Sequence, residues 1–571
     1  MIKAILHHPV RFIQQRVKWF FVFGLVLLFV NCYAQQKLYS IRSTNTGEII
    51  QKANTDSIKW VETLNERQER DQDKGYLLAG TDSISKGDTL VAWYFKGQRF
   101  YWLKLQVDSV SQSIFSQFNL KQIELKLFRI KQWAKIKQRV IYYCRENGYP
   151  NALIKLQNIA VIHDSIAATV YLQLGAFVRF GDLIVQGDTV LSNRILARHI
   201  GFKQNLPYSD DIAKNIDQRL NELPYLQVAQ SSEIYRINNR ANAYLFLKRK
   251  SANQFSGIIG LANSSKNKSK LLLTGELNLN LINALKKGEE LSIEWQKLQE
   301  QTQELKTHFV FPYIMGSAIG LDASFMLYKH DTTYLTTNPN IGVRYQTKGS
   351  SYIRAFMDYK TSNVLLQQTI DEEVGSITQF LYGAEYYAVD LDNRYNPYKG
   401  YKLNASASTG SRTLKPLDKL DNTTEKRQQY KIDAEIYIPL APQLTFKLRN
   451  YSAYLSGSKH VVNEMFRLGG VSNLRGIEEN SLRVSAFSVQ TAEIRLIFES
   501  ASALFLFFDG AWYEQRLTKG YYSDKPIGLG AGMQFTTKAG VFSLQYAVGE
   551  QRGTTLSFSQ AKIHIGYINR F

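Results

Sequence analysis

From about residue 254 to the C-terminus, apolar residues occupy every second position over many segments. Residues 271–281 alternate five leucines with polar or small residues, and residues 430–440, 527–535 and 541–548 repeat the pattern with other apolar side chains. Strict alternation predicts β-strands with one apolar and one polar face, because successive side chains of a strand point to opposite sides. About 16 such strands fit into residues 254–571, at roughly 20 residues for each strand with its turn.

Two architectures alternate in this way, a soluble β-sandwich and a transmembrane β-barrel. Many segments here reach the roughly 9–11 residues that a tilted membrane-spanning strand needs. Aromatic residues gather near strand ends, as in an interfacial girdle, at Tyr382, Tyr386, Tyr387, Tyr395, Tyr398 and Tyr401. The polar face carries charges that suit a wet lumen better than a dry sandwich core, at Lys431, Asp433, Glu435, Lys447 and Arg449.

These features favour a 16-stranded antiparallel transmembrane β-barrel over residues 254–571, closed so that no strand edge is left unpaired in lipid. Residues 284–304 and 361–377 stay open as long loops or as strand ends.

Upstream, residues 35–250 change to helices mixed with short strands. In residues 177–250 the pattern predicts a strand at 178–186, helices at 193–200 and 209–223, and strands at 226–236 and 241–249. Ser209 is the expected N-cap of the second helix. The apolar stripe of that helix consists of Ile212, Ile216, Leu220 and Leu223.

The same order of elements occurs twice more upstream. Residues 98–176 predict a strand at 99–107, a short helix at 111–118, a long helix at 125–145, and strands at 151–162 and 165–174. Gly148 suits the left-handed position after the long helix. Residues 35–97 predict a reduced copy with a helix at 56–72 and strands at 76–84 and 88–95. The chain therefore carries tandem α+β modules ahead of the barrel.

Residues 1–34 have the layout of a cleaved signal peptide. Four basic residues precede about 12 apolar ones, and small Ala34 ends the segment. About 12 apolar residues are too few to span a membrane. A lipoprotein anchored at Cys32 is the alternative, although Val30 and Asn31 stand where small residues are wanted. Cleavage lowers the formal charge from +21 to 21 − 4 = +17. Outside the cytoplasm this charge fits anionic membrane surfaces and no longer argues for nucleic acid as a partner.

Enzyme motifs are missing from the sequence. It contains no G-x-S-x-G, H-E-x-x-H, C-x-x-C or G-K-S/T run, and Cys144 is the one cysteine left after cleavage. The glycines at 528, 530 and 532 alternate with apolar residues inside a strand, so they form a small stripe on its polar face. We therefore expect no catalytic residue, metal ligand or cofactor.

Five short runs resemble those of a known family. They are residues 146–152 (ENGYPNA), 180–187 (FGDLIVQG), 392–401 (DNRYNPYKGY), 466–477 (FRLGGVSNLRGI) and 507–510 (FFDG). Together with the order of modules and barrel, they resemble the BamA/TamA outer-membrane assembly superfamily, also called bacterial surface antigens, and its TamA-like members in particular. Proteins of this family carry tandem POTRA modules in front of a transmembrane barrel.

The resemblance implies a functional loop in the lumen. The loop motif consists of Gly469, Gly470, Arg475 and Gly476, with Ile477 where the family usually has an aromatic residue. In the family the arginine docks on an acidic residue of a nearby strand, and here Asp509 is the expected partner. A guanidinium and a carboxylate form a rigid, two-pronged pair when they are sheltered from bulk water.

The resemblance also implies a barrel seam. Residues 254–264 and 561–571 are the expected first and last strands, and the last one resembles a C-terminal outer-membrane signal at Ile563, Ile565, Tyr567 and Phe571.

The implied function is an outer-membrane protein assembly factor, with its modules in the periplasm. Its partners would be unfolded outer-membrane proteins and outer-membrane lipids, and an inner-membrane or lipoprotein partner stays open. Two alternatives remain. One is a two-partner-secretion type transporter that exports a dedicated protein, and the other is a passive pore or surface-binding barrel.

Overall fold

A computed structural model describes most of the chain after the N-terminal segment. The described residues are 37–55, 57–87, 89–108, 112–118, 126–263, 271–297, 302–365, 374–415, 422–457, 459–499, 502–517, 520–537 and 540–570. The expected signal peptide, residues 1–34, and Phe571 lie outside them. The chain divides into two compact units, one ending at Phe177 and the other beginning at Val178. In the described part, no helix is both long and apolar enough to cross a membrane.

The first unit holds two α+β modules. The first module contains β1 (Lys37–Ser43), β2 (Ile49–Thr55), α2 (Ser57–Asp73), β3 (Gly80–Ser85) and β4 (Thr89–Phe95). Its sheet has the order β2-β1-β4-β3, with β1 parallel to β4. The core consists of Trp60 and Leu64 of the helix packed on Tyr39 and Tyr94 of the sheet. The helix and the last two strands were expected, whereas β1 and β2 were missed.

The second module contains β5 (Tyr101–Val107), α3 (Gln112–Phe115), η1 (Ser116–Phe118), α4 (Ile130–Glu146), β6 (Leu153–Ile162) and β7 (Ser165–Gln173). Its sheet has the order β5-β7-β6. The long helix begins at Ile130, five residues later than expected. Gly148 has a φ of +92°, as its place after the helix predicts.

The third module begins the second unit. It contains β8 (Arg179–Gly187), α5 (Asn193–Ile200), α6 (Asp210–Lys214), α7 (Ile216–Asn221), β9 (Leu226–Ile237) and β10 (Arg240–Arg249), with the sheet order β8-β10-β9. Ser209 caps α6 as predicted, because its Oγ accepts the Ile212 N–H at 3.2 Å. The single helix expected over 209–223 is interrupted at Asn215 (φ −98°, ψ 7°), which bonds back to Asp211. Short polar side chains compete with the helix backbone in this way.

The rest of the second unit is an antiparallel barrel. Its strands are β11 (Gln254–Asn263), β12 (Leu271–Ile282), β13 (Glu290–Lys297), β14 (Gln303–Phe311), β15 (Ile319–His330), β16 (Tyr334–Gln346), β17 (Tyr352–Val364), β18 (Ser376–Leu391), β19 (Gly400–Lys415), β20 (Thr423–Ala441), β21 (Leu444–Leu455), β24 (Ala486–Glu499), β25 (Ser502–Leu517), β26 (Gly520–Asp524), β27 (Ile527–Thr536), β28 (Val541–Glu550) and β29 (Lys562–Arg570).

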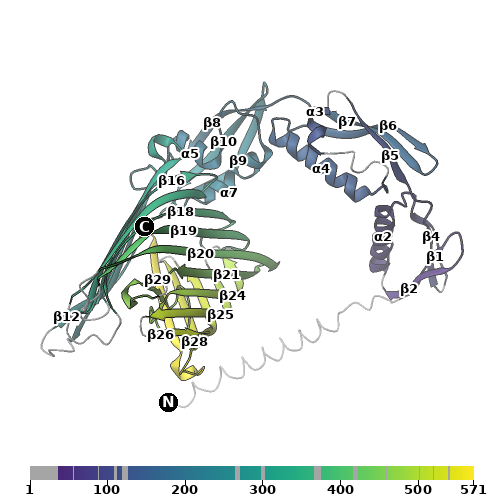
Figure 1. Cartoon of the computed structure of the whole chain (residues 1–571). Coiled ribbons are helices and arrows are strands. Elements are labelled where there is room, and N and C mark those ends of the chain that lie inside the picture. The colour runs from purple at the N-terminus through teal and green to yellow at the C-terminus, as the bar shows by residue number, and fades with distance from the viewer. Residues whose placement is uncertain are drawn as a thin grey trace, which may run out of the picture. The chain divides into compact units, whose positions relative to one another are not determined.

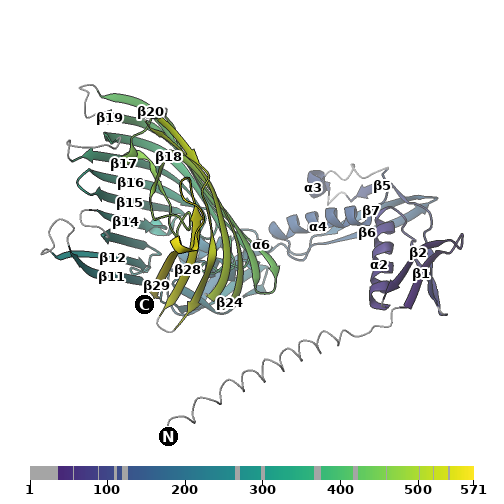
Figure 2. The same ribbon diagram turned by 90° about the horizontal axis from the view of Figure 1, so that it is seen from below.

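The strands pair in chain order around the barrel, and Figure 2 shows them side by side from β11 to β20. Both β26 and β27 pair with β25, so they are two parts of one interrupted strand, and the barrel has 16 strands. Residues 284–304 include β13, and residues 361–364 end β17.

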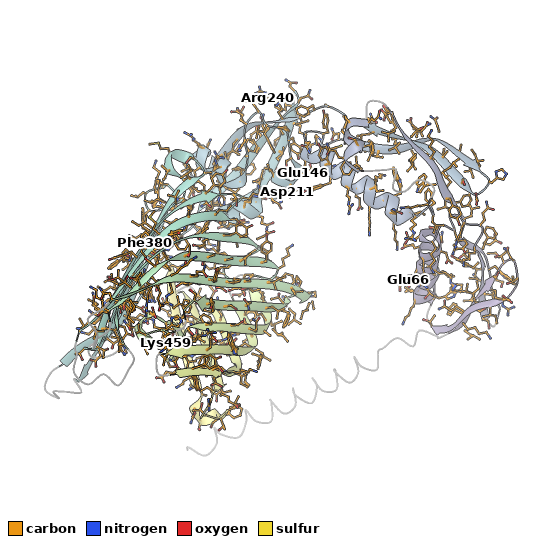
Figure 3. The ribbon with its side chains drawn as sticks, in the orientation of Figure 1. Glu66, Glu146, Asp211, Arg240, Phe380 and Lys459 are labelled. Atoms are coloured by element: carbon orange, nitrogen blue, oxygen red, sulfur yellow. The ribbon has the colours of Figure 1, made fainter. Side chains whose placement is uncertain are left out.

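The alternation of side chains matches the expected two faces. Figure 3 labels Phe380 on the barrel wall, and this residue is 42% exposed. Four of the five charges expected in the lumen meet as ion pairs there. Arg449 Nε lies 2.8 Å from Asp433 Oδ1, and Lys447 Nζ lies 3.5 Å from Glu435 Oε2. The polar face of these strands is therefore a connected network.

The third module is docked on the barrel turns nearest to it in Figure 1. The Asn283 amide donates to the Val190 carbonyl at 3.2 Å, and His199 Nδ1 lies 2.8 Å from the Tyr313 hydroxyl. Ser350 N–H donates to the Glu222 carboxylate at 2.6 Å. Ile282 and Tyr313 of the barrel also belong to the apolar core of the module. Three successive turns, after β12, β14 and β16, thus hold the module.

Candidate functional site: the lumen loop and the barrel seam

The connection between β21 and β24 is the long loop that carries the glycine-rich motif. Residues 456–485 contain η4 (Val462–Glu464) and a short hairpin of β22 (Phe466–Leu468) and β23 (Leu482–Val484). The three motif glycines have positive φ angles, +114° at Gly469, +100° at Gly470 and +87° at Gly476. Residues that carry a side chain rarely adopt positive φ angles, so glycine suits these turns.

At the tip of this loop, Arg475 and Asp509 form a two-pronged pair. Arg475 Nε donates to Asp509 Oδ2 at 2.8 Å and Nη2 donates to Oδ1 at 2.7 Å. The backbone N–H of Arg475 also donates to Asp509 Oδ2, at 3.1 Å, and the Thr491 hydroxyl donates to Oδ1 at 2.8 Å. Asp509 is 1% exposed, so the bonds are sheltered from water.

The same guanidinium has two further contacts. Its Nη1 donates to Glu493 Oε2 at 3.0 Å, and its centre lies 3.5 Å from the centroid of the Phe507 ring. Arg475 is therefore held by two carboxylates and an aromatic face. Removing one partner of such a buried ion pair costs about 3–5 kcal/mol, because the other charge is left without compensation. Bidentate and stacking contacts of this kind also favour arginine over lysine.

Close backbone approach allows the loop tip to reach the wall. A Cβ at Gly528 would overlap the carbonyl oxygen of Arg475, and one at Gly476 would lie 2.5 Å from the carbonyl oxygen of Val548. Gly528 belongs to the small stripe noted in the sequence. The stripe therefore has a specific task, since it lets the backbone of the loop lie against β27 and β28.

Ile477, at the position where the family usually has an aromatic residue, is 4% exposed. It packs in an apolar cluster with Leu468, Leu474 and Val484 of the loop and Phe487 of β24. An aliphatic side chain fills this site and anchors the loop through apolar contacts.

A second charge cluster, which the sequence did not predict, holds the beginning of the loop. The Glu464 side chain is completely buried. It accepts hydrogen bonds from Arg412 at 3.0 and 2.9 Å, from Arg427 at 3.3 and 3.2 Å, and from the Val461 N–H at 3.1 Å. Next to it, the Asn463 amide donates to the Ser362 hydroxyl at 2.7 Å. Only alternation could have signalled Arg412 and Arg427, as lumen-facing charges.

Two more lumen contacts involve residues far apart in sequence. Arg467, in β22, pairs with Glu304 of β14. Asn396, from the run at 392–401, is 2% exposed and accepts a bond from Arg495 of β24 at 3.1 Å. Glu493 and Arg495 also pair with each other. The loop is thus fixed to β14, to β19 and β20, and to β24 and β25.

The seam between the first and last strands is short. β11 and β29 pair only through Gln254 with Arg570 and Phe255 with Asn569 among the described residues. By contrast, β11 and β12 pair over ten residues of β11, and β28 and β29 over seven. Ile563, Ile565 and Tyr567 of β29 are 64%, 80% and 40% exposed, and each lies opposite a residue of β28. The barrel is therefore nearly closed, with a weakly paired seam.

Among the residues that the structure describes, no group of three or more His, Cys, Asp and Glu side chains is placed to hold a metal ion.

Residues 283–566 match the Omp85 superfamily domain. The protein is a member of the Omp85 superfamily. As an Omp85 barrel it is expected in a bacterial outer membrane. No curated protein sequence matches the chain.

Two solved structures of CdiB support the fold of this Omp85 protein. CdiB from Escherichia coli is similar with a TM-score of 0.53 and 12% identity, over 90% of this chain and 97% of that chain. CdiB from Acinetobacter baumannii has a TM-score of 0.51 and 13% identity, over 90% and 98%. BamA from Haemophilus ducreyi lacking POTRA domains 1–3 has a TM-score of 0.40 and 14% identity, over 82% and 99%. The likeness to CdiB concerns the fold alone.

Proposed function

We propose that this Omp85 protein is an outer-membrane protein assembly factor, which receives unfolded proteins through its periplasmic modules and assists their insertion at the barrel seam. The observation that carries the proposal is the pairing of β11 with β29 through only two residue pairs among the described residues. In this proposal the barrel acts in assembly or transport and catalyses no reaction.

The register of the seam indicates how much pairing is left unused. Continued along both strands, it would join residues 254–262 to residues 562–570, which is nine pairs in place of two. Each unused pair leaves backbone N–H and C=O groups that another strand can bond. An incoming strand can add by main-chain hydrogen bonds, which tolerate varied sequences. The open seam is therefore a template for a client strand.

The modules offer a second place for strand addition. In the second module β6 is an edge strand, and its Ile159 and Val161 are 58% and 60% exposed. Main-chain pairing at such an edge would hold an unfolded client without selecting its sequence. In this proposal the clients pass from the modules to the seam, while Arg475 and Asp509 keep the lumen loop seated.

A disulfide across the seam tests the proposal. We expect Ser256→Cys with Ile568→Cys, one step further along the seam register, to abolish insertion of a urea-denatured barrel protein by the full-length protein in liposomes. Reduction should restore the activity. The matched control is Ser256→Cys with Asn278→Cys, which joins β11 to a strand with which it is already paired. Full activity of the oxidised seam variant would contradict the proposal.

A two-partner-secretion type transporter is the second candidate. The lumen contains a cavity of about 520 Å³ lined by polar and charged side chains, which is the observation that favours it. A protein exported through the lumen does not need the seam to open. Export of a dedicated partner by the oxidised seam variant, together with an unchanged set of outer-membrane barrels in cells, would favour this candidate.

A further inference from the structure

A cavity of about 450 Å³ lies between the third module and the rim of the barrel. Its walls come from α6, α7, the turn after β16, and the ends of β18 and β19. They include Asp211, Arg219, Glu222, Lys348, Tyr386, Asp390 and Tyr401. Sites for small ligands have volumes of about 300–1,000 Å³, so this cavity can hold one. Nothing in the loop or the seam uses it.

The cavity opens on the outer face of the barrel. Glu385 of β18 points into the lumen, where it bonds to Arg354 at 3.1 Å. Because side chains alternate along a strand, Tyr386 and Asp390 point outward. Tyr401 lies opposite Asp390 on the neighbouring strand and so shares its face. Both tyrosines are 47% exposed. Exposed tyrosines at strand ends mark the level of the lipid headgroups.

A largely buried carboxylate faces this cavity. The side chain of Glu222 is 11% exposed, and its Oε2 lies 3.9 Å from His199 Nε2. Glu222 also accepts a hydrogen bond from the Ser350 N–H at 2.6 Å. Burial raises the pKa of Glu222 to about 7, and His199 is neutral because burial lowers its pKa to about 4. A buried acid in this state gains free energy when a cationic group binds beside it.

The other charges around the cavity are mixed. Asp211 is labelled on the third module in Figure 3. Its Oδ2 lies 3.6 Å from Arg219 Nη2 and 4.0 Å from Lys348 Nζ. The Lys348 side chain is 74% exposed, so its ammonium group can reach a ligand at the mouth of the cavity. Asp390 accepts a hydrogen bond from Gln218. In total, three carboxylates and two cationic groups surround the space.

We propose that this cavity binds the headgroup of a zwitterionic phospholipid with a primary amine, of the phosphatidylethanolamine class, from the periplasmic leaflet. The ammonium group has three N–H donors, and the carboxylates of Glu222, Asp211 and Asp390 accept hydrogen bonds from them. The phosphate faces Lys348, and the acyl chains follow the outer wall past the two tyrosines. A choline headgroup lacks N–H donors, and an anionic headgroup meets an excess of carboxylates. The inference goes beyond the proposed function and rests only on the place of the barrel in a bilayer.

Native mass spectrometry of the full-length protein in detergent tests the selectivity directly. We expect the complex with phosphatidylethanolamine to be detected at a lipid concentration about tenfold lower than the complexes with phosphatidylcholine or phosphatidylglycerol that have the same acyl chains. Soluble glycerophosphoethanolamine should compete only at much higher concentration, because it lacks the acyl chains. Equal retention of the three lipids would overturn the proposal, and so would competition by the soluble headgroup at the concentration of the lipid. No client protein is present, so failure of the assembly proposal would leave this result unchanged.

Variants place the lipid in the cavity. Asp211→Asn with Asp390→Asn, and separately Glu222→Gln, should lower the preference for phosphatidylethanolamine by about tenfold. The control is Glu233→Gln, because Glu233 lies on β9 of the same module and does not line the cavity. Heat-dependent migration in gels shows that each barrel is folded. A preference that survives in both cavity variants, or that falls equally in the control, would contradict the assignment.

Discussion

At the scale of the residue, a few positions decide whether the lumen loop can reach the barrel wall. Arg475 supplies the charge, but the glycines of the wall supply the room. A Cβ at Gly528 would overlap the carbonyl oxygen of Arg475, although the strand conformation at Gly528 is ordinary. Charge pairing and close backbone approach are therefore coupled. Loss of the Arg475 charge or addition of a side chain at Gly528 should each free the loop tip.

We expect Gly528→Ala to displace the loop tip and to weaken the bonds between Arg475 and Asp509, because the new methyl group overlaps a backbone oxygen that cannot rotate away. The docked loop tip should lose about 1–3 kcal/mol of stability, which is the usual cost of overpacking a tightly packed site. Limited proteolysis of the loop measures it. Gly520→Ala is the matched control, since a Cβ there has no neighbour within 4 Å. Equal loop protection in the two variants would show that the close approach is unimportant.

At the scale of the element, burial disfavours the charged forms of two side chains that attach the third module to the barrel. The Nε2–H of His199 donates to the Arg219 carbonyl at 2.8 Å, so Nδ1 accepts the hydrogen bond from Tyr313 at 2.8 Å. Glu222 is the second titrating group of the interface. Burial lowers the pKa of His199 from 6.5 to about 4 and raises the pKa of Glu222 from 4.5 to about 7. Both shifts disfavour charge at the docking surface.

The two shifts predict opposite pH dependences of docking. The His199 contribution is present above pH 6.5 and is lost as the pH falls towards 4. The Glu222 contribution is present below pH 4.5 and is lost as the pH rises through 7. Docking of the wild-type protein should therefore change little between about pH 4.5 and 6.5.

Single variants should uncover each slope. With Glu222→Gln, the docked state should gain stability as the pH rises from 4 to 6.5, by up to about 1.4 kcal/mol per pH unit. With His199→Gln it should lose stability as the pH rises from 4.5 to 7. Hydrogen exchange of the α5 and α7 amides, corrected for the intrinsic effect of pH, measures this. A flat profile in both variants would contradict the interpretation.

At the scale of the whole molecule, two separate charge clusters hold one loop across the barrel, together with the pair of Arg467 with Glu304. Glu464 fixes its beginning to β19 and β20, and Arg475 fixes its tip to β24 and β25. Because the clusters share no residue, releasing one leaves the other in place. Breaking both clusters should therefore loosen the loop more than breaking either one, while the pair of Arg467 with Glu304 still joins it to β14.

Conductance in planar bilayers tests this arrangement. We expect Arg475→Ala and Glu464→Gln each to give a small rise in current, and the double variant to open the pore well beyond the sum of the two. Independent effects of distant sites add, so an excess in the double variant identifies a shared barrier. Arg516→Ala is a control, because Arg516 is a strand arginine whose ion pair with Glu514 lies outside both clusters. Full opening by a single variant would exclude two independent locks.

Local chemistry made part of this fold predictable. Alternation at 271–281 and 527–535 predicted strands, because the side-chain period of a strand is local. Ser209 and Gly148 were predicted as helix ends for the same reason. The interruption at Asn215 and the late start of α4 were not predicted, since the apolar stripe alone does not locate a break.

The sequence by itself determined that the chain alternates into a barrel, that its lumen is charged, and that Arg475 and Asp509 are of matching chemistry. Tertiary structure alone decided which charges meet. Glu464 reaches Arg412 and Arg427, and Arg475 reaches Glu493 as well as Asp509, only because closure of the barrel sets the registers of strands distant in sequence. It likewise decided that the seam is short and that Glu222 is buried on the barrel rim. Periodicity fixes the face on which a side chain lies, but its partner depends on the whole ring of strands.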